Sequence, residues 1–268
     1  MRYTLSPAIH TAAFKALGLE WIYLAWPVPP DALEAALGGL RALGCAGANI
    51  TMPHKQTALA HLDELSPDAQ ATGAVNTIEC LPGRLVGHNT DVYGFVEFLA
   101  SDAGVTATER RALVLGAGGA SRAVVTALER LGATRIEVAA RDADAAAAVA
   151  ALGKEGLCVP LEWHNATEAA AGADIVVNAT PLGMNGEMVL DGVTWRAGQV
   201  VVDLVYDPPS TPLVEGARAQ GADAWGGIGM LVHQAAGALR IWTGLKPPLE
   251  VMSAAAVSAI GRRASTSP

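Results

Sequence analysis

The most constraining feature of the sequence is an apolar run that leads directly into a glycine-rich turn and then into a helical pattern. Residues 112–115 read Ala-Leu-Val-Leu, and the turn that follows is Gly116-Ala117-Gly118-Gly119-Ala120-Ser121. Residues 123–131 continue with helical spacing, and Gly132 ends that pattern. A strand, a tight turn and a helix in this order begin a βαβ unit, which predicts a parallel sheet.

The composition of the turn indicates what it binds. Gly116 allows the tight turn, Gly118 lets the backbone approach a pyrophosphate, and the small Ser121 permits close contact between helix and strand. The start of the helix adds free N–H groups and a positive dipole end. Glycine-rich turns between strand and helix also occur for packing alone, but the flanking strand and helix favour a dinucleotide site.

Bulk composition narrows the class of protein. The 268 residues suffice for two domains or one large one, and a hydrophobic content of 51% supplies a core. Charged residues make up only 16%, and the net charge is -8, which argues against binding nucleic acid or an anionic membrane through a basic surface. The partner we expect is a small molecule.

The cysteines and the N-terminus bear on the compartment. Cys45, Cys80 and Cys158 are odd in number and form no C-x-x-C pair, so neither a disulfide framework nor a zinc site is predicted. The six histidines have no metal-ligand spacing, so we expect no metal. No basic stretch precedes an apolar core, and no run approaches the ~18 apolar residues of a membrane span. We expect a reduced, cytoplasmic compartment.

Strand and helix patterns alternate along the chain, which predicts an α/β fold whose sheet is covered on both faces. Ser6 and Pro7 predict a helix N-cap and first turn ahead of residues 8–17, with Gly18 as the stop. A second helix is predicted from Pro29-Pro30-Asp31 to Gly44. The strands predicted in this half are 21–26, 47–50, 75–80 and 84–88, the last two joined by Pro82-Gly83. A linker helix and a domain boundary are expected between Asp91 and Arg111.

Three polar clusters interrupt the apolar sequence of the first half. They are Asn49-Ile50-Thr51-Met52-Pro53-His54-Lys55, Gly73-Ala74-Val75-Asn76-Thr77 and Asn89-Thr90-Asp91. Side chains at the ends of buried elements converge on small polar ligands. Lys55 and Asp91 offer a proton donor and a charged partner, the minimum for general acid/base chemistry on a hydroxyl or carbonyl. The alternative is an exposed salt bridge of little consequence. For His54 we expect a packing role.

The strand predicted at residues 135–140 should end beside the adenosine ribose of a bound dinucleotide. Arg141 follows at once, and its guanidinium could hold a 2'-phosphate, which favours NADP. Asp142 would repel that phosphate or hold a ribose hydroxyl of NAD, so the choice between the two cofactors stays open. Arg141 could also be a solvated loop cation.

Eight motifs in order give the chain a resemblance to the shikimate dehydrogenase family over nearly its whole length. Four are the clusters and the glycine turn quoted above, and the others are Ser6-Pro7-Ala8-Ile9-His10, Asn178-Ala179-Thr180-Pro181-Leu182-Gly183-Met184, Asp203-Leu204-Val205-Tyr206 and Gly229-Met230-Leu231-Val232-His233-Gln234. The resemblance implies reversible hydride transfer between a nicotinamide cofactor and 3-dehydroshikimate, giving shikimate on the route to chorismate and the aromatic amino acids.

The resemblance also implies roles for single residues. Lys55 would donate the proton to the developing alkoxide, and Asp91 would hold Lys55 and a substrate hydroxyl. Thr51, Asn76 and Gln234 would take the other hydroxyls, and Thr4, Ser6 and Tyr206 the carboxylate, with the start of the helix at Pro7 adding its positive end. The residues implied in cofactor binding are Gly116, Ala117, Gly118, Gly119, Ala120, Ser121, Arg141, Asn178, Ala179, Thr180, Met184, Leu204, Gly227 and Met230.

The family architecture implies a discontinuous substrate domain, residues 1–96 with 229–268, and a Rossmann cofactor domain, residues 97–228, with the substrate in a closing cleft between them. The chain departs from the family at three points. A first strand is missing ahead of the Ser6 motif, and a longer N-terminus would supply it. Thr4 stands where the family has serine, which bears on the choice between shikimate and quinate. Ala140 and Ala145 replace residues common in NADP-specific members.

Three functions fit the sequence. The first is an NADP-dependent shikimate dehydrogenase. The second is a quinate/shikimate dehydrogenase that also uses NAD. The third is a non-catalytic binding protein that has kept the fold, against which the retained Lys55 and Asp91 speak. The protein is expected to be a monomer or homodimer.

Overall fold

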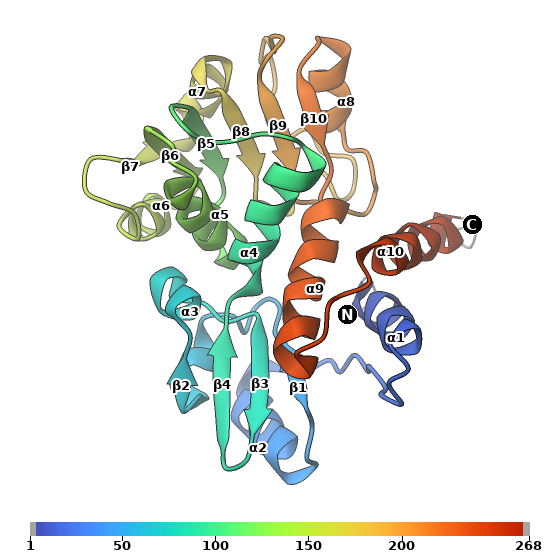
Figure 1. The fold of residues 1–268 in the computed structure, drawn as a ribbon. Coiled ribbons are helices and arrows are strands. Elements are labelled where there is room, and N and C mark those ends of the chain that lie inside the picture. Colours follow the sequence, from blue (N-terminus) through green and yellow to red (C-terminus); the bar gives the residue numbers. More distant parts are fainter. Residues whose placement is uncertain (1–3, 265–268) are drawn as a thin grey trace. The chain divides into compact units, whose positions relative to one another are not determined.

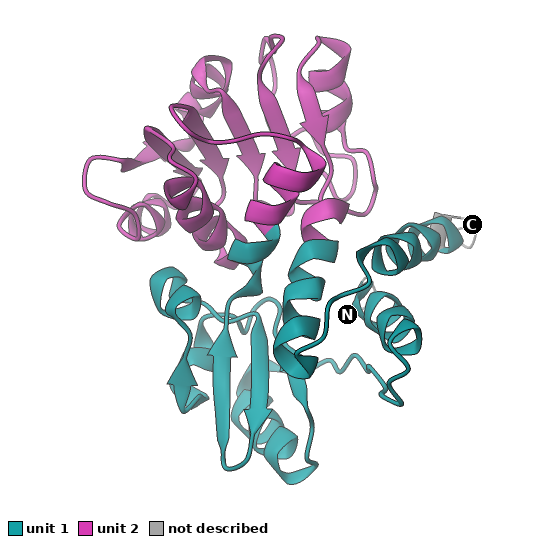
Figure 2. Ribbon diagram, viewed as in Figure 1, with its two compact units in different colours: residues 1–94, 232–268 teal, residues 95–231 magenta. Residues whose placement is uncertain are grey.

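The computed structural model describes residues 4–264 and divides the chain into two compact units. Unit 1 comprises residues 1–94 and 232–268, and unit 2 comprises residues 95–231 (Figure 2). The chain passes between them within two helices, α4 (Thr90–Glu97) and α9 (Ile228–Thr243). The expected boundaries, after residue 96 and before residue 229, fall within these same two helices.

Unit 1 is built on a four-stranded mixed sheet in the order β1-β3-β4-β2 (Figure 1). Its strands are β1 (Gly47–Asn49), β2 (Glu64–Leu65), β3 (Thr77–Leu81) and β4 (Arg84–His88). Strands β3 and β4 form the predicted hairpin, and Gly83 takes the positive φ of 79° that its turn requires. β1 runs antiparallel to β3, whereas β2 runs parallel to β4. The hairpin and the strand at 47–49 are therefore confirmed.

The remaining elements of unit 1 are helical. They are α1 (Ser6–Ala16), η1 (Pro30–Ala32), α2 (Leu33–Ala42), η2 (Thr57–His61), α3 (Pro67–Thr72), α4, α9 and α10 (Leu249–Ala264). The first helix and the last pack side by side (Figure 1). Leu33, Leu37 and Leu40 on one face of α2 join Ile78 and Leu85 of the hairpin in a buried core.

The strand predicted at residues 21–26 is wrong. Its alternating pattern survives in the burial, because Trp21 and Tyr23 are partly buried whereas Ile22 and Trp26 are 81% and 51% exposed. A strand also needs a backbone partner. β1 pairs with β3 along one edge, and no other strand of residues 4–264 pairs with it. No strand precedes β1 within residues 4–264. The prediction that a longer N-terminus supplies a first strand lies outside the described residues.

The start of α1 also differs from the expectation. Ser6 is the first residue of the helix, and the N-cap position belongs to Leu5, whose side chain makes no capping bond. Thr4 takes over part of that role, because its Oγ1 accepts the backbone N–H of Ser6 at 3.2 Å. The predicted end is confirmed, since Gly18 follows the helix with a φ of 66°.

Unit 2 contains a six-stranded parallel sheet in the order β10-β9-β8-β5-β6-β7 (Figure 1). Its strands are β5 (Arg111–Leu115), β6 (Arg135–Ala140), β7 (Cys158–Glu162), β8 (Ile175–Asn178), β9 (Val200–Asp203) and β10 (Asp223–Trp225). Its helices are the π-helical turn η3 (Phe98–Asp102), α5 (Gly119–Arg130), α6 (Ala143–Ala150), η4 (Trp163–Asn165), α7 (Ala166–Gly172) and α8 (Pro212–Ala219).

This sheet is doubly wound. Leu113, Val176 and Val201 on one face form a core with α7 and α8, while α5 and α6 lie against β5, β6 and β7. The order of strands reverses at β5, because β6 lies on one side of it and β8 on the other. Such a reversal leaves a crevice at the carboxyl ends of the strands, which is where the glycine turn stands. No helix of residues 4–264 is long and apolar enough to cross a membrane.

Candidate active site

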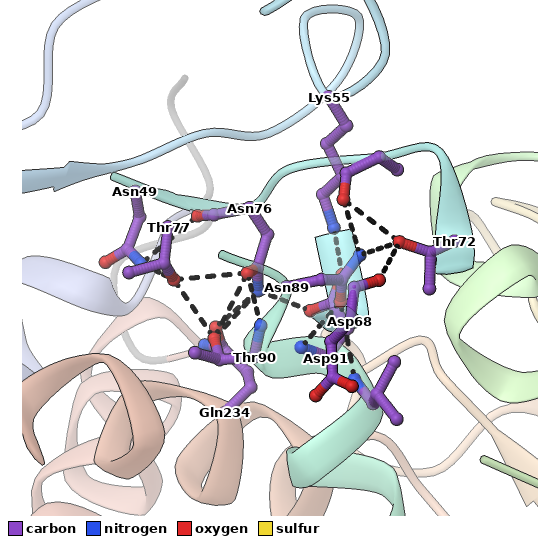
Figure 3. Close-up of polar contacts among 12 residues, drawn as sticks. Asn49, Lys55, Asp68, Thr72, Asn76, Thr77, Asn89, Thr90, Asp91 and Gln234 are labelled. Atoms are coloured by element: carbon purple, nitrogen blue, oxygen red, sulfur yellow. Dashed lines mark hydrogen bonds and ion pairs between the residues drawn. The ribbon is translucent and has the colours of Figure 1, made fainter. Parts of the chain in front are cut away.

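The ion pair between Lys55 and Asp91 lies at the centre of the polar residues of unit 1 (Figure 3). Lys55 Nζ donates to Asp91 Oδ2 at 2.5 Å, and the side chains are only 16% and 7% exposed. The pair is therefore not an exposed surface salt bridge, which was the alternative interpretation. Taking two charges out of water is costly unless further hydrogen bonds satisfy them. Asp91 has such a bond, since its Oδ1 accepts from Asn76 Nδ2 at 2.8 Å.

Backbone bonds fix the loop that carries Lys55. The loop follows β1, and the Lys55 carbonyl accepts the N–H of Val75 at 2.7 Å. His54 Nε2 lies 2.8 Å from the carbonyl oxygen of Val28, and its ring is buried. The packing role expected of His54 thus includes a hydrogen bond that ties this loop to the preceding segment.

Asn76 organises the centre of the site. Its Oδ1 accepts the backbone N–H of Thr90 at 2.7 Å, which orients the carboxamide. Its Nδ2 faces three acceptors, Thr90 Oγ1 at 3.0 Å, Asp91 Oδ1 at 2.8 Å and Gln234 Oε1 at 3.3 Å. Two amide hydrogens cannot serve three acceptors fully, so the cluster can redistribute its bonds around a polar ligand.

Asn89 places Asp91 at the start of α4. Its Oδ1 accepts the backbone N–H groups of Asp91 at 3.1 Å and Val92 at 3.4 Å, as a capping side chain does. Its Nδ2 donates to Thr72 Oγ1 and to the carbonyl of Ala74. The sequence singled out the cluster that contains Asn89 but not this capping role.

Other network members were missed as site residues. Thr77 Oγ1 lies 3.1 Å from Asn76 Oδ1 and 3.0 Å from Thr90 Oγ1. Asn49 Nδ2 donates to Thr77 Oγ1 at 3.0 Å. Asn49, Thr77 and Thr90 all belong to the polar clusters of the sequence, so their grouping along the chain could be seen there. Their partners could not, because hydrogen bonds across two strands depend on register.

The structure places the remaining predicted substrate residues in three locations. Thr4 and Ser6 lie together at the start of α1, with Thr4 Oγ1 donating to Ser6 Oγ at 3.2 Å. Thr51 is exposed on the loop after β1. Tyr206 belongs to unit 2, where it follows β9.

The predicted cofactor residues all lie in unit 2, and most follow the carboxyl end of a parallel strand. Gly116 follows β5 with a φ of 105°, and a Cβ there would lie 3.0 Å from Thr180 Cγ2. A Cβ on Gly118 would meet nothing within 4 Å, so open space lies beside that backbone. The twelve-residue helix α5 begins at Gly119. Ser121 Oγ, two residues further on, is buried and has no hydrogen-bond partner among residues 4–264. These features fit the phosphates of a dinucleotide.

The two residues that follow β6 differ in their surroundings. Arg141 is exposed directly after the strand. Asp142 is the N-cap of α6, and its Oδ1 accepts the N–H of Ala145 at 3.0 Å. This cap gives the Asp142 carboxylate a structural role, besides the two effects on cofactor choice considered from the sequence.

Asn178 orders the loop after β8 through a buried network. Its Nδ2 donates to Asp203 Oδ1 at 2.8 Å and to the Leu182 carbonyl, and its Oδ1 accepts from Thr180. Burial raises the pKa of Asp203, and hydrogen bonds from Thr211, Val205 and Asn178 offset part of that rise. Asn178 therefore fixes this loop through buried hydrogen bonds, whereas the Met184 side chain on the loop is exposed.

The last predicted cofactor residues lie after β9 and β10. A Cβ on Gly227 would lie only 2.3 Å from the Leu204 carbonyl oxygen, so only glycine fits. The Gly227 N–H donates to Val205 O at 3.0 Å, and Met230 is buried in the first turn of α9. Close backbone contact thus joins the segments after the two strands.

Comparison with known proteins agrees with this arrangement. Residues 1–78 match the shikimate dehydrogenase substrate binding domain, residues 99–204 the shikimate / quinate 5-dehydrogenase family, and residues 227–257 the shikimate 5'-dehydrogenase C-terminal domain. A shikimate dehydrogenase (NADP(+)) of Citrifermentans bemidjiense is 43% identical over 254 residues, covering 92% of this chain and 88% of its own. The chain belongs to the shikimate dehydrogenase family.

Two solved structures of the family bear on the ligands. Shikimate 5-dehydrogenase from Thermus thermophilus, in complex with NADP(H) and shikimate, is 41% identical with a TM-score of 0.87, over 96% of this chain and 95% of that one. Quinate dehydrogenase from Corynebacterium glutamicum, in complex with NAD, is 34% identical with a TM-score of 0.87, over 95% and 93%. The relatives of this fold thus include a shikimate dehydrogenase with NADP(H) bound and a quinate dehydrogenase with NAD bound.

Proposed function

We propose that the protein is an NADP-dependent shikimate dehydrogenase, which reversibly reduces 3-dehydroshikimate to shikimate in the biosynthesis of chorismate and the aromatic amino acids. The observation that carries the proposal is the buried Lys55–Asp91 pair, joined through Asn76 to Gln234, in a chain of this family. A surface pair would need no such network, whereas a proton donor aimed at a substrate oxygen must be held in place.

The mechanism follows from the charges of this pair. Bound NADPH supplies the hydride that adds to the carbonyl carbon at C3. As negative charge develops on the carbonyl oxygen, Lys55 Nζ donates a proton to it, and a hydroxyl results. Asp91 holds the ammonium group through the 2.5 Å bond and accepts a hydrogen bond from a neighbouring substrate hydroxyl. Solvent then returns a proton to Lys55.

The other residues would bind and orient the two ligands. Thr51, Asn76 and Gln234 take the ring hydroxyls, while Thr4, Ser6 and Tyr206 take the carboxylate. The turn from Gly116 to Ser121 holds the pyrophosphate at the start of α5, and Arg141 the 2'-phosphate. The loop ordered by Asn178 and the segments at Leu204, Gly227 and Met230 border the nicotinamide end.

The compartment and the remaining partners belong to the same proposal. Cys45, Cys80 and Cys158 are all unpaired in the structure, which suits a reducing cytoplasm. The partners we propose are the substrate and the nucleotide, bound to a monomer or homodimer.

The test pairs shikimate or quinate with NADP or NAD in all four combinations and follows absorbance at 340 nm. Strong reduction only with shikimate and NADP is the expected result. Signal of similar size with quinate and NAD would instead favour a quinate/shikimate dehydrogenase, the second candidate. That candidate is favoured by the quinate dehydrogenase relative and by Ala140 and Ala145 at positions where NADP-specific members carry other residues. A folded protein without signal in any combination would contradict both and leave the non-catalytic binding protein.

A further inference from the structure

The segment between α1 and η1 pairs with no strand of residues 4–264, yet it contacts the candidate site at two points. The hydroxyl of Tyr23 donates to Asn49 Oδ1 at 2.8 Å. The carbonyl of Val28 faces His54 Nε2 at 2.8 Å, beside Lys55. Neither Tyr23 nor Asn49 has a role in the mechanism above.

Ring contacts hold Tyr23 in place. Its ring stacks on that of His10, with centroids 4.5 Å apart and an interplanar angle of 4°. Trp242 of α9 lies near both, with centroids 6.3 Å from Tyr23 and 5.2 Å from His10. An aromatic ring fixed between α1 and α9 delivers its hydroxyl at a defined point with little loss of conformational freedom on binding.

The bond to Asn49 has a direction that other contacts impose. Asn49 Nδ2 donates to Thr77 Oγ1 at 3.0 Å and to the Asn76 carbonyl at 3.3 Å, so its Oδ1 is left as an acceptor toward Tyr23. Thr77 continues the chain to Asn76, and Asn76 to Asp91 (Figure 3). Tyr23 thus stands at the outer end of the network that orients the proton donor.

On its other side the Tyr23 hydroxyl meets the start of α1. Burial raises the pKa of Tyr23 to about 12, and the neighbouring Ser6 hydroxyl offsets part of that rise. A protonated phenol is the donor that its bond to Asn49 Oδ1 requires. Ser6 is in turn bonded to Thr4, so the hydroxyls assigned to the substrate carboxylate adjoin the same phenol.

We propose that Tyr23 is a positioning residue for the substrate, whose hydroxyl holds the Asn49 carboxamide and, through it, the ring-binding network. The inference rests on the proposed function and names a residue beyond those given roles in it. It acts through Asn49, because the phenol fixes the carboxamide that supports Thr77 and Asn76. The ligand it serves is a small hydroxylated ring acid.

The test is Tyr23→Phe, which keeps the ring and its stacking and removes only the hydroxyl. Leaving the half-buried Asn49 Oδ1 without the Tyr23 donor should raise the KM for shikimate about 5- to 100-fold. The kcat should change less than about twofold and the KM for NADP should stay constant, because the hydroxyl does not touch the reacting atoms. Trp26→Phe, an exposed aromatic of the same segment, is the matched control and should behave as the wild type.

A double-mutant cycle separates positioning from packing. In an Asn49→Ala background, Tyr23→Phe should add less than about twofold to the KM, because the acceptor it served is gone. An effect of full size in that background would overturn the inference, as would an unchanged KM in the single variant. Turnover by the wild type tests the proposed function separately. Calorimetric titration of the wild type and of Tyr23→Phe with shikimate compares their Kd values without turnover. Equal Kd values would overturn the role of Tyr23.

Discussion

At the scale of the residue, the decisive feature is that Lys55 and Asp91 are buried together. An exposed pair of this kind is worth ~0–1 kcal/mol and carries no implication for chemistry. Burial makes each charge dependent on the other, and removing one partner leaves the other uncompensated. The bond from Asn76 to the second carboxylate oxygen fixes the direction of the pair, so the ammonium group is held at one point.

Replacing Lys55 with alanine should therefore remove the proton donor. We expect kcat to fall about 100- to 10,000-fold, with little loss of shikimate binding, in keeping with general acid catalysis. Steady-state kinetics and titration with shikimate measure the two effects separately. Lys154→Ala is the matched control, because Lys154 is 80% exposed and pairs only loosely with Glu129 at 3.6 Å. Unchanged turnover in the Lys55 variant would remove this residue from the mechanism.

The preference between cofactors also belongs to a single side chain. Arg141→Ala should raise the KM for NADP at least about tenfold more than the KM for NAD, because a bidentate contact to the 2'-phosphate exists only with NADP. Arg135→Ala, which changes an exposed arginine at the opposite end of the same strand, is the control and should leave both values unchanged. Equal effects of Arg141→Ala on both cofactors would show that this guanidinium does not read the phosphate.

At the scale of the element, the sequence predicted what local chemistry determines. The turn at Gly116, the hairpin around Gly83 and the stop at Gly18 rest on backbone conformations that glycine favours, and all three are confirmed. The strand predicted at 21–26 does not form, because alternating side chains do not by themselves supply a neighbouring strand for the backbone hydrogen bonds. Thr77 and Asn49 were missed as site residues, since their bonds depend on the register between β1 and β3.

The cap of α4 gives a test at this scale. Asn89→Ala should lower the free energy of unfolding by about 1–3 kcal/mol, because it removes the cap and leaves the buried groups around Thr72 and Ala74 without their donor. Denaturant unfolding measures the change, and kcat should fall with it as Asp91 loses its fixed position.

Asn165→Ala is the matched control for that experiment. Asn165 occupies the N-cap position of α7, but its side chain makes no capping bond. Its replacement should change stability by less than about 0.5 kcal/mol. Equal losses in the two variants would contradict the role given to Asn89.

At the scale of the whole molecule, unit 1 is assembled from both ends of the chain. α1 packs against α10, and His10 of α1 contacts Trp242 of α9 as well as Tyr23 and Phe14. Residues 232–243 of α9 and the whole of α10 follow unit 2 in the sequence, whereas α1 and the sheet of unit 1 precede it. These contacts make the stability of unit 1 depend on helices that are far apart in the sequence.

His10 should make that stability depend on pH. Burial lowers the pKa of His10 from 6.5 to about 3, so the folded protein holds a neutral ring where the unfolded chain would be protonated. The unfolded state then binds more protons below pH 6.5, and stability falls as the pH decreases toward the folded pKa. Between about pH 6.5 and pH 5 this group alone should cost ~2 kcal/mol, at ~1.4 kcal/mol for each pH unit.

Denaturant unfolding of His10→Phe at about pH 7.5 and pH 5 isolates this contribution, because other titrating groups act equally on both proteins. The variant keeps an aromatic ring against Tyr23 and should lose ~2 kcal/mol less than the wild type over that interval. His164→Phe, at a histidine whose side chain is 71% exposed, should follow the wild type. The free energy of unfolding could instead show the same pH dependence in the wild type and in His10→Phe. That result would mean that His10 takes up its proton in the folded protein. The packing of α1 against α9 would then not be what keeps the ring neutral.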